Sequence, residues 1–175
     1  MTRLTEGYVQ VYTGDGKGKT TAAFGTVLRA AGHGQQVAIV QFLKGSWNYG
    51  EVAAFRAFSN VDLRRVGSGF TWEAEDPGVP RGLAREAWDL CKDLAASDRY
   101  DLLVLDELNY AVTEGYVSVD EILGFLKSKP ERLSVIITGR NAAPGLVDAA
   151  DTVTEMRCVK HAFEGGAPAK KGIEY

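Results

Sequence analysis

Residues 13–21 combine the side chains and the spacing that bind a phosphate chain, and they read T-G-D-G-K-G-K-T-T. They follow the mostly apolar run 8–12 and precede the helix-forming run 22–24. A strand that enters a glycine-rich bend and leaves as a helix turns its backbone N–H groups and the positive end of the helix dipole toward one point. Lys19 adds a full charge there, and Thr20 adds a hydroxyl for a metal ion. The pattern therefore predicts a polyphosphate-binding loop.

The loop departs at one position from the strict pattern G-x-x-x-x-G-K-[ST], because Thr13 stands where the pattern has glycine. A plain turn between a strand and a helix needs neither three alternating glycines nor two lysines among them. We therefore predict that the phosphates contact these residues: Gly14, Asp15, Gly16, Lys17, Gly18, Lys19, Thr20 and Thr21.

Two charged side chains in the loop leave alternatives open. A carboxylate inside an anion site repels the anion, so Asp15 either accepts hydrogen bonds within the loop or contacts a hydroxyl. Lys17 pairs either with Asp15 or with a phosphate.

Composition narrows the class of protein. The chain has 175 residues, enough for one core, and we expect a single domain over residues 1–175 in which residues 157–175 are irregular. Within them, the glycine- and lysine-rich run 165–172 has the composition of a mobile tail.

The net charge of −3 argues against a nucleic-acid partner, and the lack of a run of about 18 apolar residues argues against a membrane span. Cys91 and Cys158 are far apart in the chain, which fits a cytoplasmic protein.

Apolar runs alternate along the chain with segments of helical periodicity. Helical patterns extend to residue 31 and cover 81–96 and 118–128, the last opening with a capping box of Ser118 and Glu121. Strand patterns cover 37–43, 61–66, 102–105, 134–138 and 152–156. Parallel strands need crossover connections, which are usually helical. The order therefore predicts an α/β fold of the P-loop NTPase-like (RecA-like) type, a three-layer sandwich around a mostly parallel sheet.

In such sheets, ligands bind at the carboxyl ends of the strands. Besides the loop, this rule selects polar residues within or just after the ends of strand patterns: Gln41, Lys44, Asp106, Glu107 and Arg140. Asp106 follows four apolar residues, the pattern of a carboxylate that meets a magnesium ion beside bound phosphates. Magnesium needs hard oxygen ligands, which Thr20 with Asp106 or Glu107 supplies. Glu107 either orients a water molecule, as in an ATPase, or holds the metal or a ribose hydroxyl, as in a transferase.

Phe70 and Trp72 lie one residue apart in a loop at the ligand end of the predicted sheet. Aromatic side chains bury large areas, so spacing alone favours a pair that anchors the loop to the core. The alternative is a platform for a large, flat, partly apolar second substrate.

Four tracts carry a more particular pattern than the general nucleotide motif. They are 9–25 around the loop, 40–45 (V-Q-F-L-K-G), 69–72 (G-F-T-W), and the ending formed by 159–163 (V-K-H-A-F) and 172–175 (G-I-E-Y). Together these tracts resemble the ATP:corrinoid adenosyltransferases of the P-loop type, and the resemblance spans nearly the whole chain.

The resemblance implies transfer of the 5′-deoxyadenosyl group of ATP to the cobalt of a reduced corrinoid, cob(I)alamin or cob(I)yrinic acid a,c-diamide, in adenosylcobalamin synthesis or salvage. Tripolyphosphate is then released, and Lys19 stabilises it as the leaving group. The family lacks glycine at the position of Thr13 too, and its nucleotide lies reversed, with the terminal phosphate deepest in the loop. Mg²⁺ (or Mn²⁺) contacts Thr20 and Glu107, with Asp106 nearby.

The same resemblance makes Phe70 and Trp72 functional. They crowd the lower face of the corrin and exclude an axial ligand, so that Co(II) is more easily reduced to Co(I). Gln41, Lys44 and Arg140 lie near the corrinoid pocket. An electron-donating reductase, such as a flavoprotein, and a homodimer are also implied.

Two other classes of function fit the phosphate loop. One is a P-loop NTPase or small kinase in which Glu107 positions water or an acceptor hydroxyl. The other is a non-catalytic module that binds ATP and hands a ligand to a partner. Release of tripolyphosphate excludes the first class, and consumption of ATP excludes the second.

Overall fold

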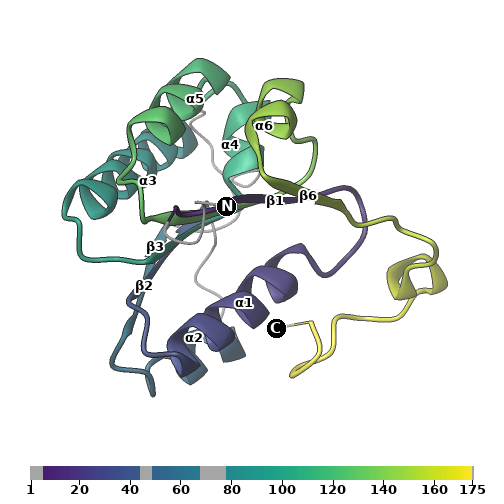
Figure 1. The fold of residues 1–175 in the computed structure, drawn as a ribbon. Helices are drawn as coiled ribbons and strands as arrows, with labels where there is room; N and C mark the ends of the chain where they lie inside the picture. Colours follow the sequence, from purple (N-terminus) through teal and green to yellow (C-terminus); the bar gives the residue numbers. More distant parts are fainter. Residues whose placement is uncertain (1–5, 44–48, 68–77, 175) are drawn as a thin grey trace.

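The computed structural model describes residues 6–43, 49–67 and 78–174, which form a layer of strands between two layers of helices (Figure 1). Within these ranges the strands are β1 (Val9–Thr13), β2 (Val37–Phe42), β3 (Val61–Val66), β4 (Leu102–Asp106), β5 (Ser134–Thr138) and β6 (Thr152–Glu155). They pair in the order β3-β2-β4-β5-β1-β6, and each pairing is parallel. The predicted parallel α/β sheet is confirmed.

Helices cover both faces of this sheet (Figure 1). One face carries α1 (Lys19–Gly32) and α2 (Gly50–Phe55). The other carries α3 (Gly78–Ala96), α4 (Leu108–Thr113), α5 (Val119–Ser128) and α6 (Pro144–Ala149). A short 3₁₀ helix, η2 (Ala162–Gly165), follows β6 and lies beyond the edge of the sheet.

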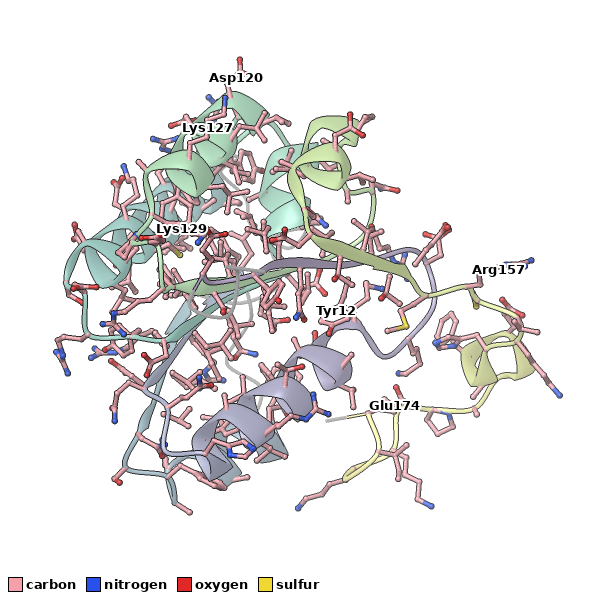
Figure 2. All side chains as sticks on the ribbon, viewed as in Figure 1. Tyr12, Asp120, Lys127, Lys129, Arg157 and Glu174 are labelled. Atoms are coloured by element: carbon pink, nitrogen blue, oxygen red, sulfur yellow. The ribbon has the colours of Figure 1, made fainter. Side chains whose placement is uncertain are left out.

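Side chains of each strand alternate between the two faces, as the pleat requires, and fill the space on either side of the sheet (Figure 2). Val37 and Ile39 of β2 belong to the core cluster under α1 and α2, whereas Val40 and Phe42 belong to the cluster under α3 and α5. The same alternation decides on which face of the sheet the polar side chains at the strand ends lie. It therefore decides which of them meet the phosphate loop.

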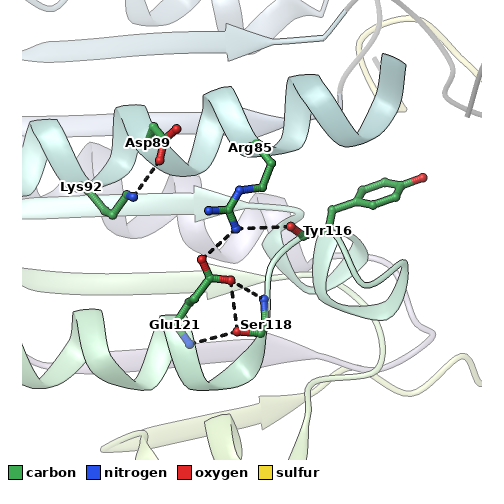
Figure 3. Close-up of polar contacts among 6 residues, drawn as sticks. All are labelled: Arg85, Asp89, Lys92, Tyr116, Ser118 and Glu121. Carbon is green, nitrogen blue, oxygen red and sulfur yellow. Dashed lines mark hydrogen bonds and ion pairs between the residues drawn. The ribbon is translucent and has the colours of Figure 1, made fainter. Parts of the chain in front are cut away.

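The predicted capping box at the start of α5 is confirmed, and it also joins two helices (Figure 3). Ser118 Oγ accepts a hydrogen bond from the Glu121 N–H at 3.2 Å, and Glu121 Oε2 accepts one from the Ser118 N–H at 3.0 Å. Arg85 of α3 donates to the other carboxylate oxygen at 2.8 Å. The hydrogen bond from the Ser118 backbone, followed by that from Arg85, lowers the pKa of Glu121 from 4.5 to about 2.

The sequence patterns do not indicate the three short helices α2, α4 and α6. Each has six residues, less than two turns, so an apolar stripe has no room to repeat. The helix predicted from residue 81 begins three residues earlier, at Gly78. Among the described helices, none combines the length and the apolar character that crossing a membrane requires.

Candidate functional site

The predicted phosphate loop joins the end of β1 to the start of α1. Gly14 and Gly18 have φ angles of 93° and 109°, which residues with a side chain rarely adopt. Gly18 is the N-cap of α1, and the first turn of that helix contains no acidic residue to counter its positive end. Thr13 is not among the residues with positive φ, so threonine fits where the strict pattern has glycine. The backbone of the loop therefore suits an anion.

Lys19 reaches across the loop from the first turn of α1. It is 8% exposed, and its Nζ donates hydrogen bonds of 2.8 Å to both Gly14 O and Gly16 O. An ammonium group carries three donors, so a phosphate oxygen can take the third. Lys19 thus braces the bend and also presents its charge to a ligand.

Burial and three charged side chains influence the pKa of Lys19. Burial is the main influence and lowers the pKa of Lys19 from its ordinary value. The carboxylate of Glu107 opposes this shift, Arg140 adds to it, and Asp15 opposes it more weakly. Asp15 and Arg140 are both exposed, which places them at the rim of the site.

Polar side chains at the ends of three strands meet on the α1 face of the sheet. Asp106 of β4 is completely buried, and its Oδ1 accepts hydrogen bonds from Thr20 Oγ1 and Thr138 Oγ1, both at 2.8 Å. Its Oδ2 accepts a hydrogen bond from Gln41 Nε2 at 3.0 Å. We call Thr20, Gln41, Asp106 and Thr138 the strand-end cluster. Because Thr20 donates its proton to Asp106, the hydroxyl oxygen keeps lone pairs for a cation.

Glu107 follows the cluster and turns the chain into α4. Its φ is 65°, a left-handed conformation that costs a residue with a side chain about 1–3 kcal/mol and is common at functional sites. Its N–H donates to Thr138 Oγ1 at 2.9 Å. Gly139 lies opposite, where an added Cβ would be 2.9 Å from the Cβ of Asn109 and 3.3 Å from Glu107 Oε2. The glycine therefore leaves the space that the Glu107 carboxylate uses.

Lys19, Thr20 and Glu107 border a cleft of about 610 Å³. It is larger than the hollow of about 370 Å³ between α3 and α5. One wall is formed by the loop and the first half of α1, another by the start of α2, and a third by the end of the chain. Its lining includes Lys19, Thr20, Thr21, Tyr49, Glu107 and Ile173.

After β6 the chain packs against the phosphate loop, runs outward through η2, and turns back to end beside α1 (Figure 1). We call residues 156–174 the C-terminal segment. The Met156 N–H donates to Thr13 O at 2.8 Å, and the Gly16 N–H donates to Met156 O at 2.7 Å. A Cβ on Gly14 would lie 2.5 Å from Met156 O, and one on Gly16 would lie 2.7 Å from the Arg157 carbonyl. Both glycines therefore make room for this segment.

The far end of the C-terminal segment returns to the mouth of the loop. In Figure 2, Arg157 points outward at the outer bend, and Glu174 lies beside the start of α1. Glu174 Oε2 pairs with Lys17 Nζ, and the two side chains are 24% and 53% exposed. Of the two partners that the sequence suggested for Lys17, Asp15 is replaced by Glu174, and a phosphate stays a prediction.

Comparison with known proteins agrees with this arrangement. Residues 5–175 match the family described as ATP:corrinoid adenosyltransferase BtuR/CobO/CobP. The chain belongs to this family. A corrinoid adenosyltransferase of Pseudomonas aeruginosa is 46% identical over 99% of this chain and 86% of its own length. The corrinoid adenosyltransferases of Escherichia coli K12 and Salmonella typhimurium, the latter named CobA, are each 43% identical over 97% of this chain and 86% of theirs.

The structure brings most of the predicted site residues of this adenosyltransferase together, and Arg140 is exposed near enough to influence the pKa of Lys19. The loop residues, Asp106 and Glu107 meet at one cleft or directly behind it. Gln41 is also brought to this point, but it is completely buried. Lys44, Phe70 and Trp72 lie outside the described residues.

Sequence reasoning did not select Thr138, the C-terminal segment or Tyr49. Thr138 is a single polar residue at the end of the apolar run 134–138, and it bonds to both Asp106 and Glu107. Its place at the carboxyl end of a strand was the one signal that could have found it.

The donor set of the cleft suits a hard cation that is shared with phosphates. Within the described residues, no group of three or more His, Cys, Asp or Glu side chains could enclose a metal ion alone. Mg²⁺ usually keeps several waters and takes one or two protein oxygens beside substrate phosphates. The Thr20 hydroxyl, with the Asp106 and Glu107 carboxylates next to it, fits that requirement.

Proposed function

We propose that this protein transfers the 5′-deoxyadenosyl group of ATP to the cobalt of cob(I)alamin or cob(I)yrinic acid a,c-diamide, in adenosylcobalamin synthesis or salvage. Corrinoid adenosyl transfer is the activity of the family to which the chain belongs. The observation that carries the site assignment is the convergence of Lys19, the free end of α1 and the Thr20–Asp106 pair at one cleft.

The reaction makes the whole triphosphate a leaving group. The electron pair of Co(I) forms the Co–C bond with C5′ of the ribose, and the pair of the C5′–O bond leaves with tripolyphosphate. Negative charge therefore grows on the phosphates as the bond breaks. Lys19, the loop N–H groups and the end of α1 stabilise that charge because they are already oriented before the reaction.

Mg²⁺ is the proposed metal, and Thr20 and Glu107 would hold it, with Asp106 behind Thr20. When bound it supplies neutralising charge to the phosphates. The chain's own contribution is to keep the Thr20 O–H directed at Asp106 and to hold Glu107 at the edge of the cleft.

Phe70 and Trp72 are proposed to crowd the lower face of the corrin, with Lys44 and Arg140 near the pocket. A corrin without its lower axial ligand is easier to reduce to Co(I). We predict that Phe70→Ala and Trp72→Ala lower adenosylation strongly while ATP affinity stays nearly unchanged. Nucleotide titration beside a turnover assay separates the two effects, and full activity in both variants would leave the pair as loop anchors.

We also propose that a reductase, such as a flavoprotein, delivers the electron in the cytoplasm and that the protein acts as a homodimer. The free cysteines, buried Cys91 and exposed Cys158, are compatible with a reducing compartment. Sedimentation analysis of the purified protein tests the dimer directly.

The decisive experiment mixes the protein with ATP, Mg²⁺ and chemically reduced corrinoid, then follows the cobalt spectrum and identifies the inorganic product. We expect an alkylcobalt spectrum together with tripolyphosphate. Orthophosphate without a spectral change would indicate a P-loop NTPase or kinase instead. ATP binding without consumption would indicate a non-catalytic module.

A further inference from the structure

Gln41 is a polar residue in a strand that is otherwise entirely apolar. The strand β2 reads V-A-I-V-Q-F, and every residue in it is buried. Val37 and Ile39 face α1, so alternation puts Gln41 on the same face, at the carboxyl end of the strand. In the parallel ladder Gln41 is directly opposite Asp106. With none of its surface exposed, Gln41 meets other groups of the protein rather than a ligand in the cleft.

The amide of Gln41 donates to the Asp106 oxygen opposite the one that the two threonines contact. Its Nε2 donates to Oδ2 at 3.0 Å, while Thr20 and Thr138 donate to Oδ1 at 2.8 Å. Donors on both oxygens fix the rotation of the carboxylate about its own bond. The oxygen that faces Thr20 therefore stays an acceptor, and the Thr20 proton stays directed at Asp106.

The carbonyl oxygen of the Gln41 amide shows that the hydrogen bond to Asp106 is kept although it lowers the stability of the fold. Gln41 Oε1 is buried and has no hydrogen-bond partner among the described residues. A buried carbonyl without a donor destabilises the folded protein. Turning the amide over would place Oε1 against the Asp106 carboxylate, two acceptors facing each other, so the orientation is dictated by Asp106. A residue chosen for packing alone would be apolar, like its neighbours in the strand.

We propose that Gln41 is a positioning residue: it locks the Asp106 carboxylate so that Thr20 Oγ1 keeps its lone pairs for the cation that accompanies ATP. The proposal rests on the proposed role of Mg²⁺. It gives Gln41 a role in ATP binding that acts through Asp106, in place of contact with the corrinoid.

The test compares two buried amides that each have an unbonded carbonyl. Gln41→Met keeps the length of the side chain but removes the donor to Asp106. Asn109→Leu removes the matched amide, whose Nδ2 donates to Gly139 O and whose Oδ1 also lacks a partner among the described residues. Equilibrium binding of ATP is measured by calorimetry over a range of Mg²⁺ concentrations and again in EDTA, without corrinoid.

For Gln41→Met we expect the Mg²⁺ concentration at half-saturation to rise about 10–100-fold, as for other residues that orient a metal ligand. ATP binding in EDTA should stay within about twofold of the original protein, and Asn109→Leu should leave the Mg²⁺ dependence unchanged. Gln41→Leu also lacks the donor and is the second variant if Gln41→Met folds poorly. Thr138→Val removes another donor to Asp106 and also the acceptor of the Glu107 N–H, so it should raise the Mg²⁺ requirement at least as much.

Three results would overturn the inference. An unchanged Mg²⁺ dependence in folded Gln41→Met or Gln41→Leu removes the positioning role while leaving the proposed function intact. Equal losses with Mg²⁺ and in EDTA would show that Gln41 only supports the fold. Mg²⁺-independent binding by the original protein would remove the metal assignment and the Gln41 role together.

Discussion

Two regions contact the phosphate loop, and they are built in opposite ways. The strand-end cluster meets it from the sheet: Gln41, Asp106 and Thr138 are completely buried and joined by hydrogen bonds of 2.8–3.0 Å. The C-terminal segment meets it from outside, through backbone bonds at Met156 and an exposed ion pair at Glu174. Large apolar side chains of that segment remain exposed, namely Val159, Phe163 and Ile173.

The strengths of these contacts indicate which region sets the geometry of the loop. A buried hydrogen bond to a charged group contributes about 1.5–3 kcal/mol to stability. An exposed ion pair contributes about 0–1 kcal/mol. The strand-end cluster therefore holds the loop in place before a ligand arrives, while the outer end of the C-terminal segment, at Glu174, can move at little cost. Changes on the buried side should alter catalysis, and changes on the outer side should alter access.

The largest difference in activity is expected between substitutions of the two lysines of the loop. Lys19 is nearly buried and bonded across the loop, whereas Lys17 is exposed and paired with the C-terminal segment. We expect Lys19→Ala to lower kcat/KM for ATP about 10²–10³-fold, because it removes a fixed donor to the developing charge. Lys17→Ala should lower it less than about tenfold. Steady-state kinetics checks both, and equal losses would contradict the division into two regions.

Most of the sheet could be predicted from sequence because its strands are short apolar runs between turns. The strands predicted over 61–66 and 134–138 have those bounds in the structure. The exposed edge strand β6 was found as well, although the candidate range ran one residue too far. The short helices α2, α4 and α6 left no periodic signal, since tertiary packing rather than local pattern specifies them.

The residues of the site also divide into those that the sequence could predict and those that it could not. The loop and Asp106 were predicted because their chemistry depends on local spacing. The contact between Lys17 and Glu174 joins residues at opposite ends of the chain, and no local pattern indicates such a pair. Composition predicted a mobile tail over 165–172, but it gave no sign that Gly172 lies in the wall of the cleft. Gln41 was selected by its position at the end of a strand, but the sequence could not indicate that its amide contacts Asp106.

A change at Gly16 tests how tightly the C-terminal segment is packed where it begins. In Gly16→Ala the new Cβ would lie 2.7 Å from the Arg157 carbonyl, so the backbone there must shift. We expect a loss of about 1–3 kcal/mol in the free energy of unfolding, as for other overpacked sites. Urea unfolding measures it, and faster proteolysis after residue 157 should accompany it. Gly82→Ala in α3, which meets nothing within 4 Å, is the control and should gain about 0.5–1 kcal/mol.

The contacts of Glu121 combine features of both regions: the side chain is exposed, as in the C-terminal segment, but it has several hydrogen-bond partners, as in the strand-end cluster (Figure 3). Its pKa in the folded protein is lowered from 4.5 to about 2, so its contribution to stability is complete above pH 4.5 and is lost as the pH falls toward 2. Glu121→Gln should remove this part of the acid sensitivity, by about 1 kcal/mol or less because solvent screens the pair. Urea unfolding at pH 6, 4 and 3 checks it, and parallel curves for the two proteins would rule it out.

The smallest effect is expected at Glu174. Its carboxylate pairs with Lys17 beside the site that the triphosphate would occupy, so Glu174→Gln removes a negative charge there and frees a lysine. ATP should bind up to about fivefold more tightly, the equivalent of about 1 kcal/mol for an exposed pair. The gain should fade at high salt, because exposed charges are screened over about 10 Å at 0.1 M. Titration of ATP at low and high salt measures both. A tenfold loss of affinity would instead mean that Glu174 contacts the nucleotide, and the C-terminal segment would then belong with the strand-end cluster as part of the fixed site.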